Sequence, residues 1–225
     1  LKSASSLKRL KDLVVPTYRH TPTGKRFFFA HIPRTAGRFI EANLANNDCV
    51  WDESHMDTGL GVMSVVHGVE LAHFHRSHYE KYLDVQGIPH FSVIRNPLTR
   101  FKSASIYLKR TYGGNIQSVL EDEFLFSEMI KNLPWAEAYN WYRPQVDFLR
   151  NNTKVWKFEN KFGEDFASWL SGIVGIDLKF DDNVKYPKSK DEGSGVELTP
   201  ELIHILKHAY RKDIEHLYPE LATPL

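Results

Sequence analysis

The sequence predicts an α/β protein in which three layers, α/β/α, surround a central, mainly parallel sheet. Apolar runs at Phe27–Phe29 and Phe91–Ile94 have the composition of buried strands. Each run is followed by a short turn and then by a segment with helical periodicity. Alternation of this kind favours parallel strands with helices on both faces of the sheet. A chain of 225 residues is expected to form a single domain, residues 1–225.

The first strand is preceded by a polar stretch that ends near Pro16 and Pro22. Because prolines and polar residues interrupt regular structure, we expect residues 1–23 to form an N-terminal arm. The strand that begins at Phe27 stops in a turn of small residues, and a helix is predicted from there to about Leu44.

The second strand, Ser92–Ile94, is followed by Asn96-Pro97. Asparagine is a preferred N-cap and proline suits the first helical turn, so a helix is expected from here to about Lys109. Ser103 would lie about two turns into this helix, on a face that turns back toward Arg95. An arginine and a hydroxyl that converge at the end of a strand are suited to hold one phosphate.

The C-terminal half is predicted to contain an aromatic-rich helix over about 134–149 and a polar loop over 181–198. The final helix should start at Thr199-Pro200, which supplies an N-cap and a proline at the first position, and run to Leu217 as one element. Its predicted buried face consists of Leu202, Ile205, Leu206, Ala209, Tyr210 and Leu217.

Composition and charge limit the function classes. Hydrophobic residues make up 42% of the chain and charged residues 25%, and the formal net charge is +1. A nearly neutral chain has no overall field that attracts nucleic acid, so no nucleic-acid partner is expected and any anion site must be local. The single cysteine, Cys49, excludes an intramolecular disulfide framework. No apolar run approaches the ~20 residues of a membrane span, so we expect a cytoplasmic chain without a transmembrane segment.

The loop after the first strand has the composition of an anion-binding site. A turn between a strand and a helix leaves main-chain N–H groups pointing one way, and the helix dipole adds positive potential. Ala36 and Gly37 let a ligand approach the backbone closely, while Arg34 and Arg38 supply charge. The alternative is that both arginines pair with surface carboxylates.

A second hypothesis for the function is that this loop belongs to a P-loop-like nucleotide kinase. The Walker A pattern ends in Gly-Lys-[Ser/Thr], whereas Gly37-Arg38-Phe39 lacks both the lysine and the magnesium-binding hydroxyl. The residues therefore disfavour a magnesium nucleoside triphosphate as the ligand.

The segment His31–Phe39 resembles the His-Ile-Pro-Lys-Thr-Gly-Gly-Thr segment that binds the 5′-phosphosulfate in PAPS-dependent sulfotransferases, particularly those of the heparan 2-O- and 6-O-sulfotransferase-like group. Phe91–Ser103 is similar to the 3′-phosphate signature of the same family, an apolar strand followed by Arg-Asp-Pro and a later Arg and Ser. Tyr142–Leu149 and Val155–Glu159 are similar to the family's helix and its strand ending in Phe-Glu.

The resemblance implies a P-loop-like sulfotransferase fold and transfer of the sulfuryl group of PAPS to an acceptor hydroxyl, with PAP as the product and without a metal. It implies that the acceptor is a carbohydrate and that a loop over 181–198 covers the nucleotide. Relatives in animals are Golgi membrane proteins, so a Golgi luminal location is expected if the natural protein carries an anchor. The implied donor-binding residues are Arg34, Thr35, Ala36, Gly37, Arg38, Phe39, Arg95, Ser103, Lys188 and Ser189.

Three departures from the family pattern lie in the first motif. Arg34 stands at the position of the usual lysine, and Arg38 and Phe39 replace a pair of hydroxyl residues. An arginine keeps the charge, and Arg34 is expected to act in catalysis, but its planar fork is not equivalent to a compact ammonium. The departures suggest a third hypothesis, a nucleotide-binding module without turnover.

Sulfuryl transfer needs a group that removes the proton of the acceptor, and a histidine suits this task near neutral pH. The resemblance places the base upstream of the 3′-phosphate strand, which favours His73 first and His67 second, with His55 as a further candidate. Each of them could instead be a structural histidine.

Two other interpretations concern the residues around these histidines. His73, His75 and His78 could supply three nitrogen ligands to zinc, but no other metal-binding motif accompanies them. Aromatic residues that could stack on a sugar, or simply pack in the core, are Trp135, Tyr139, Trp141 and Tyr142.

Overall fold

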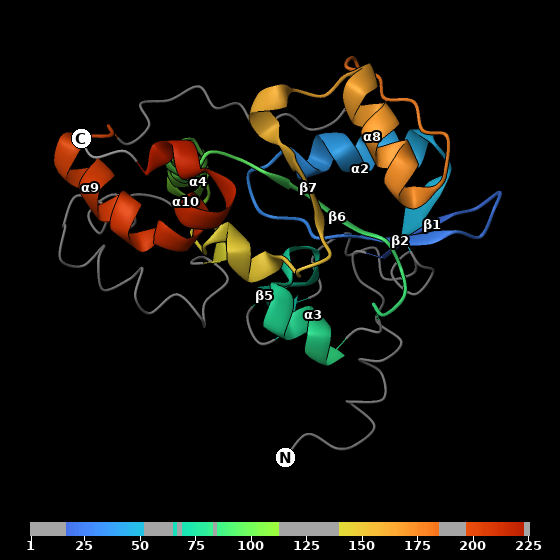
Figure 1. The fold of residues 1–225 in the computed structure, drawn as a ribbon, viewed down its shortest axis with the longest axis horizontal. Helices are drawn as coiled ribbons and strands as arrows, with labels where there is room; N and C mark the ends of the chain where they lie inside the picture. The colour runs from blue at the N-terminus through green and yellow to red at the C-terminus, as the bar shows by residue number, and fades with distance from the viewer. Residues whose placement is uncertain are drawn as a thin grey trace.

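The computed structural model of the protein describes residues 17–51, 65–66, 69–82, 85–112, 140–184 and 197–222. Five strands form one mixed sheet in the order β3-β1-β2-β6-β7 (Figure 1). Their bounds are Thr17–His20 for β1, Arg26–Phe29 for β2, Cys49–Trp51 for β3, His90–Ile94 for β6 and Lys154–Lys157 for β7. A separate antiparallel pair is formed by β4 (Val65–Val66) and β5 (Val69–Glu70).

The sheet is parallel in one half and antiparallel in the other. β6 pairs in parallel with β2 on one side and with β7 on the other, so the expectation of parallel strands is confirmed for these three. β1 is antiparallel to both of its neighbours, β2 and β3. The parallel half carries the two strands whose following loops were predicted to bind anions.

Residues Thr17–His20, which were expected to belong to the N-terminal arm, form strand β1 instead. The side chain of Tyr18 is buried and stacks on Phe27 with 5.6 Å between the ring centroids. Gly24, with a φ of 69°, closes the hairpin between β1 and β2 through a hydrogen bond from its N–H to the carbonyl of His20. The arm prediction is therefore wrong from residue 17 onward, and residues 1–16 lie outside the described residues.

The sheet buries side chains on both faces, as the alternation along β2 shows. Phe27 and Phe29 belong to the largest core cluster, together with residues of α2 (Gly37–Asn46) and α8 (Glu164–Val174). Phe28 points to the opposite face and packs with Phe74 and Tyr79, of which Tyr79 lies in α3 (Arg76–Tyr82). Figure 1 shows α2 and α8 on one side of the sheet and α3 on the other.

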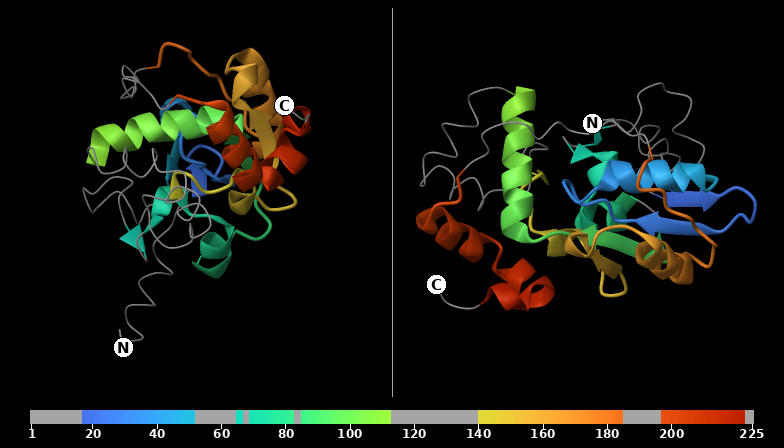
Figure 2. Two further views of the ribbon diagram at one scale, coloured as in Figure 1. Left: turned by 90° about the vertical axis from the view of Figure 1, so that its left-hand side faces the viewer. Right: turned by 90° about the horizontal axis from the view of Figure 1, so that it is seen from above.

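Three further helices gather beyond the end of β6 (Figure 1). They are α4 (Pro97–Tyr112), α9 (Pro200–Ala209) and α10 (Arg211–Leu217). Figure 2 shows α4 running across the direction of the strands. The starts of α4 and α9 confirm the predicted caps, because the side chain of Asn96 accepts hydrogen bonds from the N–H groups of Leu98 and Thr99, and that of Thr199 accepts one from Leu202.

Two helix predictions are wrong in part. Pro144 has no N–H to continue a helix, and residues 141–149 form turns and a short 3₁₀ helix, η3 (Gln145–Phe148), instead of the predicted α-helix. The final helix is divided at Tyr210, whose backbone leaves the helical region at φ −97° and ψ 23°. The predicted loop over 181–198 is described only at its two ends, so Lys188 and Ser189 lie outside the described residues.

Candidate functional site

The loop between β2 and α2 has two residues in the left-handed backbone region, Arg34 with a φ of 68° and Ala36 with a φ of 72°. This conformation costs non-glycine residues about 1–2 kcal/mol each, so the surrounding structure must hold it in place. Left-handed residues within a turn direct successive N–H groups into anion-binding concavities. Ala36 is also the N-cap of α2, and no side chain caps the helix there.

Three hydrogen bonds fix the carbonyl groups of this loop. The Thr35 hydroxyl donates to the carbonyl of Ile32 at 2.7 Å, and Arg95 Nη1 donates to the carbonyl of Arg34 at 3.3 Å. Arg100 Nε donates to the carbonyl of Pro33 at 2.9 Å. With its carbonyls turned outward to these donors, the loop can direct its N–H groups inward.

The guanidinium of Arg34 lies against α4. Its Nε donates to Ser103 Oγ at 2.9 Å, and its central carbon lies 5.2 Å from the centre of the Tyr107 ring. Ser103 therefore contacts Arg34 directly, whereas the sequence pattern had paired it with Arg95.

Arg95 follows β6, and its main chain is held by one side chain. Gln145 accepts a hydrogen bond from the N–H of Arg95 at 2.9 Å and donates one to its carbonyl at 2.7 Å. The Arg95 guanidinium lies over the Phe158 ring, 4.5 Å from its centre, and Nε donates to the Thr99 hydroxyl. Glu159 accepts the N–H of Asn96 at 2.7 Å, so the Phe-Glu pair after β7 supports the turn that carries Arg95.

Arg38 and Phe39, both predicted to bind the donor, point in different directions. Arg38 is exposed on the first turn of α2. The side chain of Phe39 is buried in the main core, with its ring 5.3 Å from that of Phe162. The main-chain N–H of Phe39 bonds to the carbonyl of Ala36, so neither part of this residue is directed to a ligand.

Gly37 is required for a reason that the sequence did not indicate. A β-carbon on Gly37 would lie 1.7 Å from Nε2 of His31, and its φ is not positive. The close approach at this glycine is therefore to the imidazole ring of His31 rather than to a ligand.

His31 and His73 lie together beside the loop. The His31 ring stacks on Phe29, and its Nδ1 is 3.1 Å from Oε1 of Glu41, one turn into α2. The ring of His73 meets that of His31 edge-on with 4.7 Å between centroids, and it meets the ring of Trp141 edge-on at 5.2 Å. The structure therefore brings the first-choice base next to the predicted anion loop, whereas His55 and His67 lie outside the described residues.

Comparison with models of known protein families, with curated proteins and with solved structures found no match.

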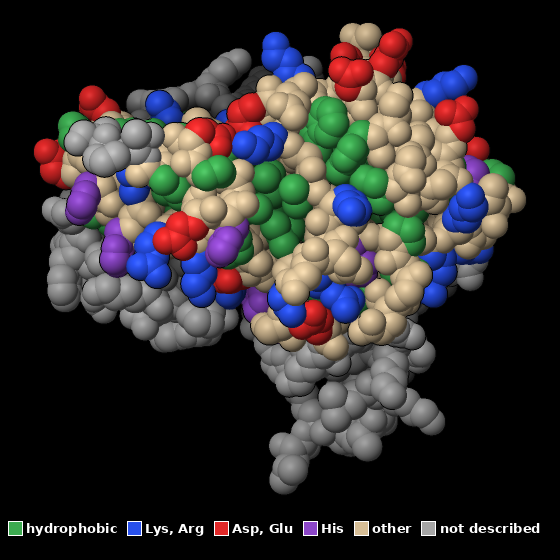
Figure 3. All heavy atoms as spheres, viewed as in Figure 1, with side chains coloured by type: hydrophobic (Ala, Val, Ile, Leu, Met, Phe, Trp, Pro, Cys, Tyr) green, Lys and Arg blue, Asp and Glu red, His purple; other side chains and the backbone are tan. Residues whose placement is uncertain are grey.

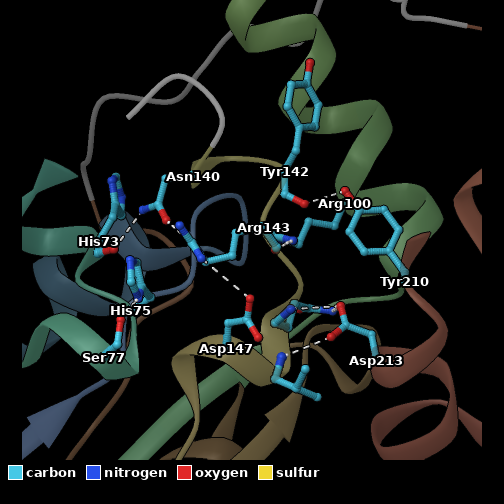
Figure 4. Close-up of polar contacts among 12 residues, drawn as sticks. His73, His75, Ser77, Arg100, Asn140, Tyr142, Arg143, Asp147, Tyr210 and Asp213 are labelled. Atoms are coloured by element: carbon cyan, nitrogen blue, oxygen red, sulfur yellow. Dashed lines mark hydrogen bonds and ion pairs between the residues drawn. The ribbon is translucent and has the colours of Figure 1, made fainter. Parts of the chain in front are cut away.

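The backbone of His73 is tied to a chain of polar contacts that Figure 4 shows. Asn140 Nδ2 donates to the carbonyl of His73 at 2.8 Å, and Asn140 Oδ1 accepts a hydrogen bond from Arg143 Nε at 2.8 Å. Nη1 of Arg143 lies 3.6 Å from Oδ2 of Asp147. Burial raises the pKa of Asp147 and the charge of Arg143 opposes this effect. This series of polar contacts fixes the backbone of the segment that carries His73.

The three histidines considered as zinc ligands do not form a metal centre. Among the described residues, no group of three or more His, Cys, Asp or Glu side chains is arranged to hold a metal ion. His75 turns its ring toward His78, with 4.1 Å between centroids, and its Nδ1 lies 3.0 Å from the Ser77 hydroxyl (Figure 4).

The burial of His75 predicts that the folded protein loses stability in acid. Burial, with smaller effects of Arg143 and His78, lowers the pKa of His75 to about 3 from an ordinary 6.5. As the pH falls, the unfolded chain binds a proton at this histidine before the folded protein does, and this difference lowers the free energy of unfolding. The free energy of unfolding is therefore expected to fall progressively as the pH drops from about 6.5 toward 3.

Urea unfolding of the wild type and of His75→Asn between pH 7 and pH 4 measures this effect. Asparagine cannot be protonated, so the variant should lose less stability over this interval than the wild type. His216→Asn, on the exposed side of α10, is the matched control and should follow the wild type. Parallel curves for wild type and His75→Asn would contradict the assignment.

Three residues that hold the site were given no role by the sequence. Arg100 donates to three carbonyls, those of Pro33, Arg143 and Trp141. Asp213 of α10 is fully buried, and its carboxylate accepts the N–H groups of Gln145 and Val146 at 2.9 and 3.0 Å. Arg100 lies inside the second motif and could have been found there, but Gln145 and Asp213 carry no local signal.

The aromatic residues near the site are mostly enclosed. Tyr142 is buried, and its hydroxyl donates to Ser105. Trp141 is 8% exposed and stacks on Tyr107 with 4.3 Å between centroids. Packing therefore accounts for both, while Trp135 and Tyr139 lie outside the described residues.

Charge on the surface is mixed. On the face shown in Figure 3, Lys and Arg side chains alternate with Asp and Glu and form no continuous basic surface. Within the part of the chain that the structure describes, no helix is both long and apolar enough to cross a membrane.

Proposed function

We propose that the protein transfers the sulfuryl group of PAPS to a hydroxyl of an acceptor, expected to be a carbohydrate. The observation that carries the proposal is the loop after β2, where two left-handed residues, Arg34 and Ala36, lead into an uncapped helix N-terminus. Helices against both faces of the sheet are in keeping with a three-layer, P-loop-like sulfotransferase fold.

The described residues fit a donor with two separate anionic groups. The loop N–H groups and Arg34 would hold the 5′-phosphosulfate, because N–H groups at a helix N-terminus and an arginine are natural partners of such an anion. Arg95 would hold the 3′-phosphate. The Arg95 guanidinium lies on the Phe158 ring and its main chain is fixed by Gln145, so its position is prepared before a ligand binds.

In the proposed reaction the acceptor oxygen attacks sulfur in line with the leaving phosphate oxygen. The new S–O bond forms as the bond between sulfur and the bridging oxygen breaks, and PAP leaves with that electron pair. His73 takes the proton of the acceptor hydroxyl. Arg34 and the N–H groups of the loop stabilise the charge that develops on the leaving oxygen.

Binding of PAP tests the donor site. At a concentration one hundred times its Kd, PAP should raise the free energy of unfolding by about 2.7 kcal/mol. Arg95→Ala should remove most of this stabilisation, because the 3′-phosphate loses its charged partner. Thermal and urea unfolding with PAP, ADP or magnesium ATP are the measurement, and Arg211→Ala, an exposed arginine on α10, is the control.

The outcomes separate the three hypotheses. Stabilisation by PAP but not by ADP, with sulfation of a member of a panel of desulfated heparan and chondroitin oligosaccharides, supports the transferase. Binding of PAP without transfer from PAPS to any member would point to a binding module. Stabilisation by magnesium ATP alone would refute the proposal in favour of a kinase.

A further inference from the structure

The ring of His31 is held on four sides. It stacks on Phe29 at 5.3 Å with an interplanar angle of 8°, and its Nε2 edge lies against the α-carbon side of Gly37. Its Nδ1 faces Glu41, and His73 meets it edge-on. A ring enclosed in this way has one orientation, which places it between the Glu41 carboxylate and His73.

Glu41 is ionised at neutral pH although it is largely enclosed. Burial alone would raise the pKa of Glu41, but the charges of His31, His73 and Arg38 together lower it. A carboxylate that stays ionised in a poorly solvated place acts strongly on neighbouring cations, because water screens the interaction less there.

We infer that Glu41 and His31 are positioning residues for His73: His31 orients its ring, and Glu41 stabilises its protonated form. The inference rests on the proposed function, in which His73 becomes an imidazolium when it takes the acceptor proton. The negative charge of Glu41 favours that cation, and His31 lies between the two. Neither Glu41 nor His31 needs to touch the substrate.

Other charged and titratable groups lie on the elements around His73. They are Arg38 of α2, Arg34 of the loop, Arg143 after Trp141, and His75 on the same segment as His73. The three arginines are cations and oppose protonation of His73, whereas burial lowers the pKa of His75 to about 3 and leaves it uncharged near neutral pH. Removal of the Glu41 carboxylate should therefore make His73 harder to protonate, whereas removal of a cation should make it easier.

Histidine side-chain NMR titration of the full chain without ligand tests this coupling directly. In Glu41→Gln, the titration midpoint of His73 should fall, because its imidazolium loses a nearby negative charge. His31→Gln, which keeps the carboxylate and removes the positive group that competes for it, should raise the midpoint and serves if Glu41→Gln does not fold. Glu215→Gln, on the exposed surface of α10, should leave it unchanged. An identical His73 titration in the wild type, Glu41→Gln and His31→Gln would overturn the inference.

The pH profile of transfer supplies a second readout. With PAPS and the oligosaccharide panel, His73→Gln should abolish transfer, while Glu41→Gln should shift the acid limb of kcat/KM to lower pH and reduce the plateau. Glu41→Asp, which keeps the charge, should restore most of the plateau. A reduced plateau without any shift of the acid limb would show a merely structural role and refute the inference. If the wild type transfers nothing while the NMR coupling is present, the proposed function fails and the coupling stands.

Discussion

Replacement of Arg100 by methionine is expected to lower the free energy of unfolding by about 3–5 kcal/mol, because a buried carbonyl left without a donor costs about 1–3 kcal/mol. Arg100 is 1% exposed, and its guanidinium donates to the carbonyls of Pro33, Trp141 and Arg143 at 2.8–3.0 Å. Methionine fills much of the same space without donating. Urea unfolding measures the loss in stability.

Hydrogen exchange separates the local effect of Arg100 from the global one. Arg100 joins the loop between β2 and α2 to the 141–143 turn. Peptides from these two segments should therefore exchange faster in Arg100→Lys than in the wild type, while the sheet exchanges as in the wild type, because lysine keeps the charge but lacks the planar fork. Arg211→Met, an exposed matched control, should change neither stability nor exchange. Uniform exchange across the whole chain in Arg100→Lys would contradict a specific role in holding the loop.

Gly37→Ala is expected to destabilise the protein by about 2–3 kcal/mol through overpacking. The added β-carbon would lie 1.7 Å from Nε2 of His31, and the ring has little room to move between Phe29 and His73. The backbone itself accepts alanine, since the φ of Gly37 is not positive. Urea unfolding of the variant measures the effect.

Two further variants test whether the clash with His31 is the cause. Gly172→Ala, in α8, has open space around the new β-carbon and should be neutral or stabilising by up to about 1 kcal/mol. In a His31→Ala background, Gly37→Ala should lose most of its cost, which a double-mutant cycle quantifies. An equal cost with and without the imidazole ring would assign the effect to another contact.

Features that depend on neighbouring residues could be predicted from the sequence. The buried strands at Phe27–Phe29 and Phe91–Ile94, the Asn96 cap and the Thr199 cap all arise from residues a few positions apart, and all are present. The break at Tyr210 could not be predicted in this way. Its ring is buried and its hydroxyl donates to the carbonyl of Tyr142, a contact between distant parts of the chain.

The candidate site likewise has features that local motifs predict and features that depend on contacts between distant residues. The motifs indicated the loop, Arg34 and Arg95, because these residues follow strands in recognisable patterns. His31 and Glu41 are ten positions apart, and their pairing depends on the angle at which α2 leaves the loop. The same holds for Gly37, whose role is set by a ring that folds back over it. Residue types alone give no such angles.

The contact between Gln145 and Asp213 has a consequence for synthesis of the chain. The turn that carries Arg95 is held by Gln145, and Gln145 is held in turn by the Asp213 carboxylate from α10. During translation, Arg95 is therefore synthesised long before Asp213, which completes the support of its turn. We expect a nascent chain that ends before α10 to have its central strands but an unformed turn at Arg95, so that the candidate anion site forms as one of the last events after translation of the domain.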